Sequence, residues 1–238
     1  MPKFRTVLFD CDSTLSAIEG IDELAVHCRE DVERLTDAAM RGRIPLEEVY
    51  GRRLELVKPT RRSVEALGRE YVARLVPDAR ETVAALQAAG VEVRIISGGL
   101  LPAVLAVANA VGVAEDHVAA VDITFDADGS YAGFDGSSPL AATGGKRTAI
   151  ERWNIARPAM MVGDGNTDLE ARPVVDLFVA FAGVVERPSV VRAADVVIRA
   201  TSLAPLLPLA LHVDELLRTP HHSVYERGAA LSAAATSP

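Results

Sequence analysis

Five short apolar runs, each suited to one buried strand, alternate with helical patterns along most of this chain. The runs are 6–9, 91–96, 160–162, 177–180 and 196–198. The segments between most of them predict helices, notably over 78–89, 101–111 and 146–153. Strands that are apolar on both faces and alternate with helices are typical of a parallel sheet covered on both sides. We therefore expect an α/β fold built on a doubly wound parallel sheet.

Three segments depart from this alternation. Residues 16–76 are charged, hold several helical patterns and contain no clear strand run. They are expected to form a helical cap inserted after the first strand, with 1–15 and 77–220 as the α/β core. Asp128-Gly129, between alternating residues of 123–134, predicts a small β-hairpin with a two-residue turn. Residues 221–238 are rich in Ala and Ser and are expected to form a flexible tail.

The composition limits the classes of partner. The 238 residues carry 25 Lys and Arg against 33 Asp and Glu, which gives a formal net charge of −8. Nucleic acids and anionic membranes attract basic surfaces, so neither is an expected partner. Two cysteines are too few for a disulfide framework and the first residues show no signal-peptide pattern, so we expect a cytoplasmic protein. The uncharged run 95–114 contains Gly and Pro, and is interpreted as a strand end, a tight turn and a buried helix rather than a membrane span.

Three polar clusters directly follow strand runs. Asp10-Cys11-Asp12 follows the first run, Ser97-Gly98-Gly99 follows the second, and the segment 163–168 follows the third. Ligands of open α/β sheets bind at the carboxyl ends of the strands. The three clusters are therefore expected to meet in one crevice.

Four carboxylates would share that crevice: Asp10, Asp12, Asp164 and Asp168. They would repel one another unless a cation neutralised them, and their hard oxygen atoms favour Mg²⁺. A nucleophilic carboxylate beside a cation suggests phosphoryl transfer. In that reaction a carboxylate with one negative charge approaches a phosphate with two, and at 4 Å they repel by roughly 8 kcal/mol at an effective dielectric of 20. Lys146, after two glycines at a predicted helix N-terminus, is a second positive group that can offset this repulsion.

Three further polar positions are ambiguous from the residues alone. Ser97 and the two glycines after it could cradle a phosphate, although Ser-Gly-Gly is also an ordinary turn. Arg53 falls on the apolar stripe of the helical pattern 46–57. It therefore needs an anionic partner, which is either a structural carboxylate or the carboxylate of a ligand. Glu19 near a predicted helix start is commonly only a favourable partner of the helix dipole.

Four stretches together carry a family resemblance: DCDST at 10–14, SGG at 97–99, GK at 145–146 and GDGNTD at 163–168. They resemble the four motifs of the haloacid dehalogenase superfamily. More narrowly, the stretches 19–25, 131–135 and 176–178, with Arg53-Leu54 and Pro59, are similar to the phosphoserine phosphatase family. The resemblance extends from about Phe4 to Ile198.

This resemblance implies Mg²⁺-dependent hydrolysis of O-phosphoserine to serine and phosphate, the last step of serine biosynthesis. Asp10 would be the nucleophile that forms an aspartyl-phosphate, and Asp12 the general acid and then the general base. The Asp10 carboxylate, the Asp12 backbone carbonyl and Asp164 would hold Mg²⁺, with support from Asp168. The expected partner is the small-molecule substrate, and association into a homodimer is left open.

The resemblance also implies how the substrate is held. Ser97, Gly98 and Lys146 would bind the phosphate, and Glu19, Met40, Arg53 and Thr167 would bind the rest of the substrate. In particular, Glu19 would take the ammonium group and Arg53 the carboxylate. Arg41, Cys11 and the pair Ala180 and Ala182 depart from the family pattern, which bears on closure of the site and on selectivity.

Two other functions are alternatives to phosphoserine hydrolysis. The first keeps the enzyme but changes the substrate to another small phosphomonoester, such as phosphohomoserine or phosphoethanolamine. The second is a signalling receiver that stores phosphate on Asp10. The predicted cap and an acid at Asp12 both argue against the receiver, and Asp12 also argues against a dehalogenase, because halide leaves without a proton.

Overall fold

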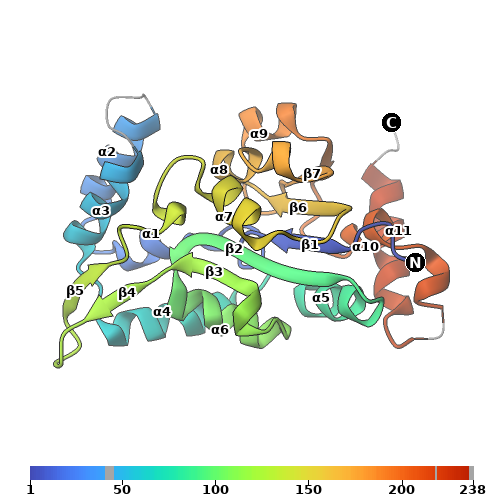
Figure 1. Ribbon diagram of the computed structural model, residues 1–238, viewed down its shortest axis with the longest axis horizontal. Coiled ribbons are helices and arrows are strands. Elements are labelled where there is room, and N and C mark those ends of the chain that lie inside the picture. Colours follow the sequence, from blue (N-terminus) through green and yellow to red (C-terminus); the bar gives the residue numbers. More distant parts are fainter. Residues whose placement is uncertain (41–45, 218, 236–238) are drawn as a thin grey trace.

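The computed structural model describes residues 1–40, 46–217 and 219–235 (Figure 1). A six-stranded parallel sheet has the order β3-β2-β1-β6-β7-β8. Its strands are β1 (Thr6–Phe9), β2 (Glu92–Leu100), β3 (Val118–Val121), β6 (Ala159–Gly163), β7 (Leu177–Phe181) and β8 (Val196–Ile198). The strand order reverses between β1 and β6, which is the position where open α/β sheets bind ligands. The predicted doubly wound parallel sheet is confirmed.

The central strands are buried on both faces. All four residues of β1 are buried, and successive side chains point to opposite sides of the sheet. Val7 and Phe9 join one hydrophobic core, whereas Leu8 joins a second core on the other face. The uninterrupted apolar run in the sequence therefore reflects helices that cover both faces.

Two layers of helices provide these cores (Figure 1). One layer comprises α4 (Arg61–Ala73), α5 (Ala79–Ala88) and α6 (Leu101–Val111). The other comprises α7 (Gly145–Trp153), α8 (Asn166–Leu169) and α9 (Pro188–Ala193). Val83 and Val104 pack in the core with Val7, and Ile150 and Val190 pack in the core with Leu8. The helices predicted over 78–89, 101–111 and 146–153 are confirmed within one residue at each end.

The insertion after β1 is helical. It holds α1 (Gly20–Leu24), α2 (Arg29–Met40), α3 (Leu46–Val57) and α4. Within the described part of 16–76, the β-structure is the single bridge between Ser16 and Leu75, which closes the base of the insertion. Gly68 lets α4 approach Ala103 and Ala106 of α6, so α4 also belongs to the layer beneath the sheet. The division into cap and core stays a prediction.

The predicted hairpin is confirmed, but its turn is shifted by one residue. Strands β4 (Ile123–Phe125) and β5 (Tyr131–Phe134) pair antiparallel. The Gly129 amide donates to the Asp126 carbonyl, and Gly129 has φ 85°. The central turn residues are therefore Ala127 and Asp128, and Gly129 takes the left-handed position after them. The expected two-residue turn at Asp128-Gly129 is wrong for this reason.

The segment 97–99 is also different from the expected tight turn. Strand β2 continues through it to Leu100, with a shift in register against β3 between Ile96 and Leu100. This irregularity changes the direction of the backbone without ending the strand. Helix α6 begins directly after Leu100, within the uncharged run 95–114. Among the described residues, no helix is both long and apolar enough to cross a bilayer.

The flexible tail expected over 221–238 is wrong for most of its length. Helix α11 (His222–Ala235) packs against α10 (Leu206–Ala210), and Val224 on α11 is buried. Alanine is the strongest helix former, so an Ala-rich segment is ordered once it finds a packing partner.

An ion pair fastens α11 to the start of α5. Arg227 donates to both oxygens of Asp78, at 2.6 and 3.1 Å, and Ser202 Oγ donates at 2.6 Å. Burial by itself would raise the pKa of Asp78, but the bonds from Arg227 and Ser202 outweigh it and lower this pKa. The stabilisation is therefore present above the ordinary carboxyl pKa and is lost as the pH falls through the lowered value.

We expect Arg227→Ala to lower the free energy of unfolding by about 0.5 to 1 kcal/mol near neutral pH, because the guanidinium is half exposed. The loss should shrink below the ordinary aspartate pKa and vanish once the pH falls through the lowered pKa of Asp78, where this carboxyl becomes protonated in the folded chain. Urea unfolding at about pH 7 and about pH 3 measures both values. Arg80→Ala, at an exposed position of α5, is the control. An equal loss at both pH values would contradict the role of the charge.

Candidate active site

A cavity of about 200 Å³ lies at the carboxyl ends of the central strands. The core contributes Asp10, Asp12, Gly98, Gly99, Lys146 and Thr167 to its lining, and the insertion contributes Glu19, Tyr50 and Arg53. The three polar clusters thus come together, as the sequence predicts, and Glu19 and Arg53 lie in the same cavity. Three further predicted residues lie beside the cavity: Ser97 contacts Asp12, Asp168 contacts Lys146, and Asp164 contacts Arg187. The side chain of Met40 lies outside the described part of the chain.

Asp10 lies directly beyond β1, where its amide donates to the Val162 carbonyl at 2.9 Å. Lys146 Nζ is 2.6 Å from Asp10 Oδ1 and also contacts Asp168 Oδ1. All three side chains are buried. Burial by itself would lower the pKa of Lys146, but the charges of Asp10 and Asp168 outweigh it and raise this pKa. The ammonium group is therefore held charged beside Asp10.

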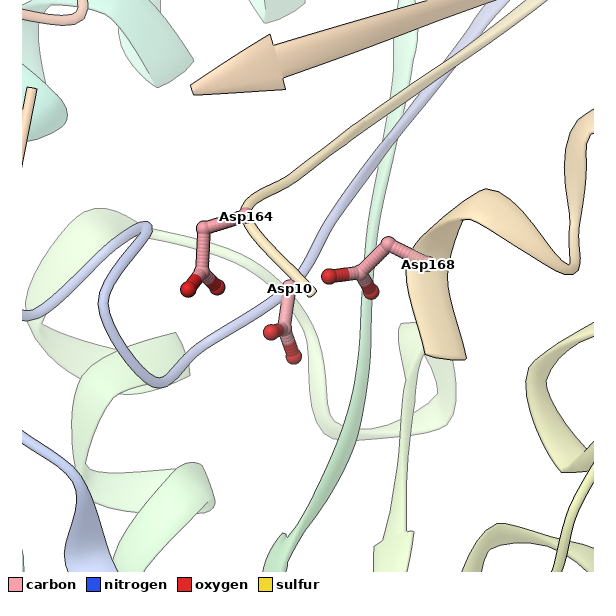
Figure 2. A group of neighbouring side chains, drawn as sticks. All are labelled: Asp10, Asp164 and Asp168. Carbon is pink, nitrogen blue, oxygen red and sulfur yellow. The ribbon is translucent and has the colours of Figure 1, made fainter. Parts of the chain in front are cut away.

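Asp10, Asp164 and Asp168 form a buried acidic cluster (Figure 2). One oxygen of each carboxylate lies within 4.8 Å of the others. Burial, followed by the charge of Asp168, raises the pKa of Asp164 to about 7. Hard oxygen atoms at this spacing suit a divalent cation such as Mg²⁺, which would relieve the repulsion.

The members of this cluster are not equivalent. Asp168 is fully buried, and its oxygens already accept from Lys146 and from the Gly165 amide, the latter at 2.9 Å. Asp10 and Asp164 each have one oxygen engaged by a side chain, Lys146 and Arg187 respectively. The residues therefore fit a cation on Asp10 and Asp164, with Asp168 orienting Lys146.

Arg187 is a site residue that the sequence did not reveal. Its Nε is 2.9 Å from Asp164 Oδ2, and its Nη2 is 2.9 Å from Glu19 Oε1. Arg187 follows β7 and directly precedes α9, so it approaches the same sheet edge from another strand. Its position after a strand run was the available signal, but no motif surrounds it.

Glu19 does more than complement a helix dipole. Its Oε1 accepts from Ser13 Oγ at 2.8 Å and from Arg187. Burial, followed by the charge of Asp12, raises the pKa of Glu19. Both contacts use Oε1, and no hydrogen bond to Oε2 is recorded among the described residues.

Arg53 has a structural carboxylate as a partner and also keeps donors for a ligand. Its Nη2 is 2.5 Å from Asp22 Oδ1, so a structural carboxylate is present. Its Nε is buried and has no hydrogen-bond partner among the described residues. A guanidinium carries five N–H donors, so donors remain for a ligand carboxylate.

Asp12 accepts hydrogen bonds on both oxygens. The Gly20 amide and the Tyr71 hydroxyl donate to Oδ1 at 2.6 and 2.5 Å. Ser97 Oγ donates to Oδ2 at 3.3 Å and itself accepts from the Gly99 amide at 2.9 Å. Ser97 therefore orients both the Asp12 carboxylate and the backbone at Gly99. Gly98 and Gly99 line the cavity.

Comparison with known proteins places this chain in a family. A family profile described as haloacid dehalogenase-like hydrolase matches residues 4–173. The chain belongs to the haloacid dehalogenase-like hydrolases. Within this family, it is 40% identical over 190 residues to the phosphoserine phosphatase of Bos taurus, covering 77% of this chain and 84% of that one. The chloroplastic phosphoserine phosphatase of Arabidopsis thaliana is 38% identical over 198 residues, with 80% and 67% covered.

Solved structures agree with this placement. A phospho-aspartyl intermediate analogue of phosphoserine phosphatase superposes with a TM-score of 0.71 at 28% identity, covering 86% of this chain and 98% of that one. A substrate-bound phosphoserine phosphatase gives a TM-score of 0.72 at 26% identity, with 87% and 98% covered. The hydrolase with the sheet order and motifs described above is therefore similar to phosphoserine phosphatases along most of its length.

Proposed function

We propose that this haloacid dehalogenase-like hydrolase is a Mg²⁺-dependent phosphatase that converts O-phosphoserine to serine and phosphate. The observation that carries the proposal is the charge pattern of one small cavity. Lys146 offers a positive charge to the phosphate, next to the Asp10 carboxylate that would attack the phosphorus. Glu19 offers a negative charge to an ammonium group, and Arg53 offers a positive charge to a carboxylate. The names of the related phosphatases support the same substrate.

In the first half-reaction, an oxygen of Asp10 attacks phosphorus. The bond between Asp10 and phosphorus forms while the bond between phosphorus and the serine oxygen breaks. Asp12 gives a proton to that oxygen, so serine leaves as a neutral alcohol. Lys146, held 2.6 Å from Asp10, offsets the repulsion between the carboxylate and the phosphate.

In the second half-reaction, Asp12 acts in the opposite direction. The Asp12 carboxylate takes a proton from water, and the water oxygen attacks the phosphorus on Asp10. The bond to Asp10 breaks, inorganic phosphate leaves and both carboxyl groups return to their starting states. One pair of carboxylates two residues apart therefore serves both steps.

The acidic cluster provides the place for the cation. Asp10, the Asp12 backbone carbonyl and Asp164 would hold Mg²⁺, and Asp168 would support the arrangement through Lys146. When bound, the ion would neutralise charge on the phosphate and polarise its oxygens.

The remaining predicted residues complete the binding of substrate. The backbone of Gly98 and the Ser97 hydroxyl would bind the phosphate, and Thr167 lines the same cavity as Gly98. Glu19 would receive the substrate ammonium on Oε2, and Arg53 would direct its unpaired donors to the substrate carboxylate. A contribution from Met40 stays a prediction.

Arg53→Ala tests the substrate class. We expect the transition-state binding of phosphoserine, calculated from the ratio of kcat/KM values, to weaken by about 2 to 5 kcal/mol, because a desolvated charge pair with the substrate carboxylate is lost. Phosphoethanolamine has no carboxylate, so its kcat/KM should change little. Steady-state assays of both substrates make the comparison.

Arg52→Ala is the matched control, since Arg52 is exposed and pairs with Glu48 on the outer side of α3. We expect it to leave both values unchanged. Equal losses on the two substrates in Arg53→Ala would refute the assigned carboxylate contact and favour another phosphomonoester.

The same proposal includes the location and the assembly of the chain. Cys11 is buried and Cys28 is also a free thiol, which fits a reducing compartment such as the cytoplasm. Residues 16–76 are proposed to act as a cap over the core at 1–15 and 77–220. Association into a homodimer stays a prediction that analytical ultracentrifugation would test.

A further inference from the structure

Tyr71 is a buried polar side chain that the proposed reaction does not yet use. It lies on α4, is fully buried, and packs in the hydrophobic core shared by the insertion and the sheet. Its hydroxyl donates to Asp12 Oδ1 at 2.5 Å, across 59 residues of sequence. A buried phenol needs a hydrogen-bond partner, and here the partner is the carboxylate assigned to proton transfer.

This contact distinguishes the two oxygens of Asp12. Oδ1 accepts from both the Tyr71 hydroxyl and the Gly20 amide. Oδ2 accepts only the longer bond from Ser97 Oγ, at 3.3 Å, among the bonds recorded for the described residues. Two short bonds to Oδ1 fix the rotation of this carboxylate, which lines the cavity, and leave Oδ2 as its less restrained oxygen.

The residue at position 20 supports the same arrangement. A Cβ atom there would overlap the Tyr71 hydroxyl and ring, so glycine is required if the start of α1 and Tyr71 are to reach one oxygen. Ser16 Oγ donates to the Tyr71 carbonyl at 3.0 Å and ties the same turn of α4 to the segment after Asp12. The tyrosine is therefore held from its backbone as well as from its ring.

We propose that Tyr71 is a positioning residue, which holds Asp12 Oδ1 so that Oδ2 faces the departing serine oxygen. The inference rests on the proposed function. As the bond between phosphorus and serine oxygen breaks and the bond to Asp10 forms, the proton passes from Asp12 Oδ2 to the serine oxygen. Tyr71 keeps its own proton throughout and acts only through the orientation of Asp12.

Tyr71→Phe separates positioning from packing, because it removes the hydroxyl and keeps the ring. We compare kcat/KM for phosphoserine, whose alkoxide needs a proton, with kcat/KM for acetyl phosphate, whose acetate leaves as an anion. Since kcat/KM reports the steps up to phosphorylation of Asp10, it isolates the role of Asp12 as an acid. We expect a loss of about ten- to a hundred-fold on phosphoserine and less than about three-fold on acetyl phosphate.

Tyr225→Phe is the control, because Tyr225 also packs against the main core but lies on α11. It should change both values by less than about two-fold. Circular dichroism and thermal unfolding confirm that each variant is folded. Equal losses on the two substrates, or no loss on phosphoserine, would overturn the inference. If the wild-type chain hydrolyses acetyl phosphate but not phosphoserine, the proposed function fails instead.

Discussion

Asp10→Asn is expected to lower kcat/KM for phosphoserine by about four orders of magnitude or more, because an amide cannot form the aspartyl-phosphate. The substitution preserves the shape of a side chain that is buried between Lys146 and the end of β1. Lys146 keeps its contact with Asp168 in this variant, so its ammonium group stays paired. The loss should therefore appear without unfolding.

Steady-state hydrolysis and thermal unfolding measured on the same samples make this test. Asp116→Asn is the control, since Asp116 is exposed and lies away from the cavity. It should retain full activity. Hydrolysis by Asp10→Asn at more than about a tenth of the normal kcat/KM would contradict a nucleophile at this position.

Lys146→Met is expected to impair both catalysis and stability. Removing the ammonium group leaves Asp10 and Asp168 buried without their cation. We expect the free energy of unfolding to fall by about 3 to 5 kcal/mol in metal-free buffer. The phosphate also loses a fixed positive group, so kcat/KM for phosphoserine should fall by about a thousand-fold or more.

Mg²⁺ distinguishes this charge effect from simple loss of packing. A divalent cation on Asp10 and Asp164 would neutralise part of the excess negative charge, so Mg²⁺ should stabilise Lys146→Met more than it stabilises the wild-type chain. Urea unfolding with Mg²⁺ and with a chelator measures both effects. Lys58→Met, at an exposed position, is the control. A stability loss that Mg²⁺ does not reduce would contradict the assigned cation site.

The layered fold was predictable because buried parallel strands leave a strong signal. Residues of β1 are buried on both faces, so the run 6–9 is apolar without alternation. The same reasoning missed β3, an edge strand of four residues of which three are half-buried. An edge strand needs no continuous apolar run, and its Ala and Val residues fit a helix as well as a strand.

The clusters at the carboxyl ends of strands were equally visible. Their convergence follows from parallel topology, in which successive strands end at one edge. Arg187 and Tyr71 were not visible, because their importance comes from tertiary contacts with Asp164 and Asp12. Neither residue belongs to a local motif, and a buried tyrosine at helical spacing looks like ordinary core.

The central claim is that the phosphoryl group passes through Asp10. Enzyme mixed with phosphoserine and Mg²⁺, quenched within milliseconds in acid and digested with pepsin, can be analysed by fragmentation mass spectrometry. We predict one phosphoryl group on Asp10 during turnover, absent from Asp12 and absent after the substrate is exhausted. Serine release without any modification of Asp10, or a phosphoryl group on a different residue, would contradict the mechanism.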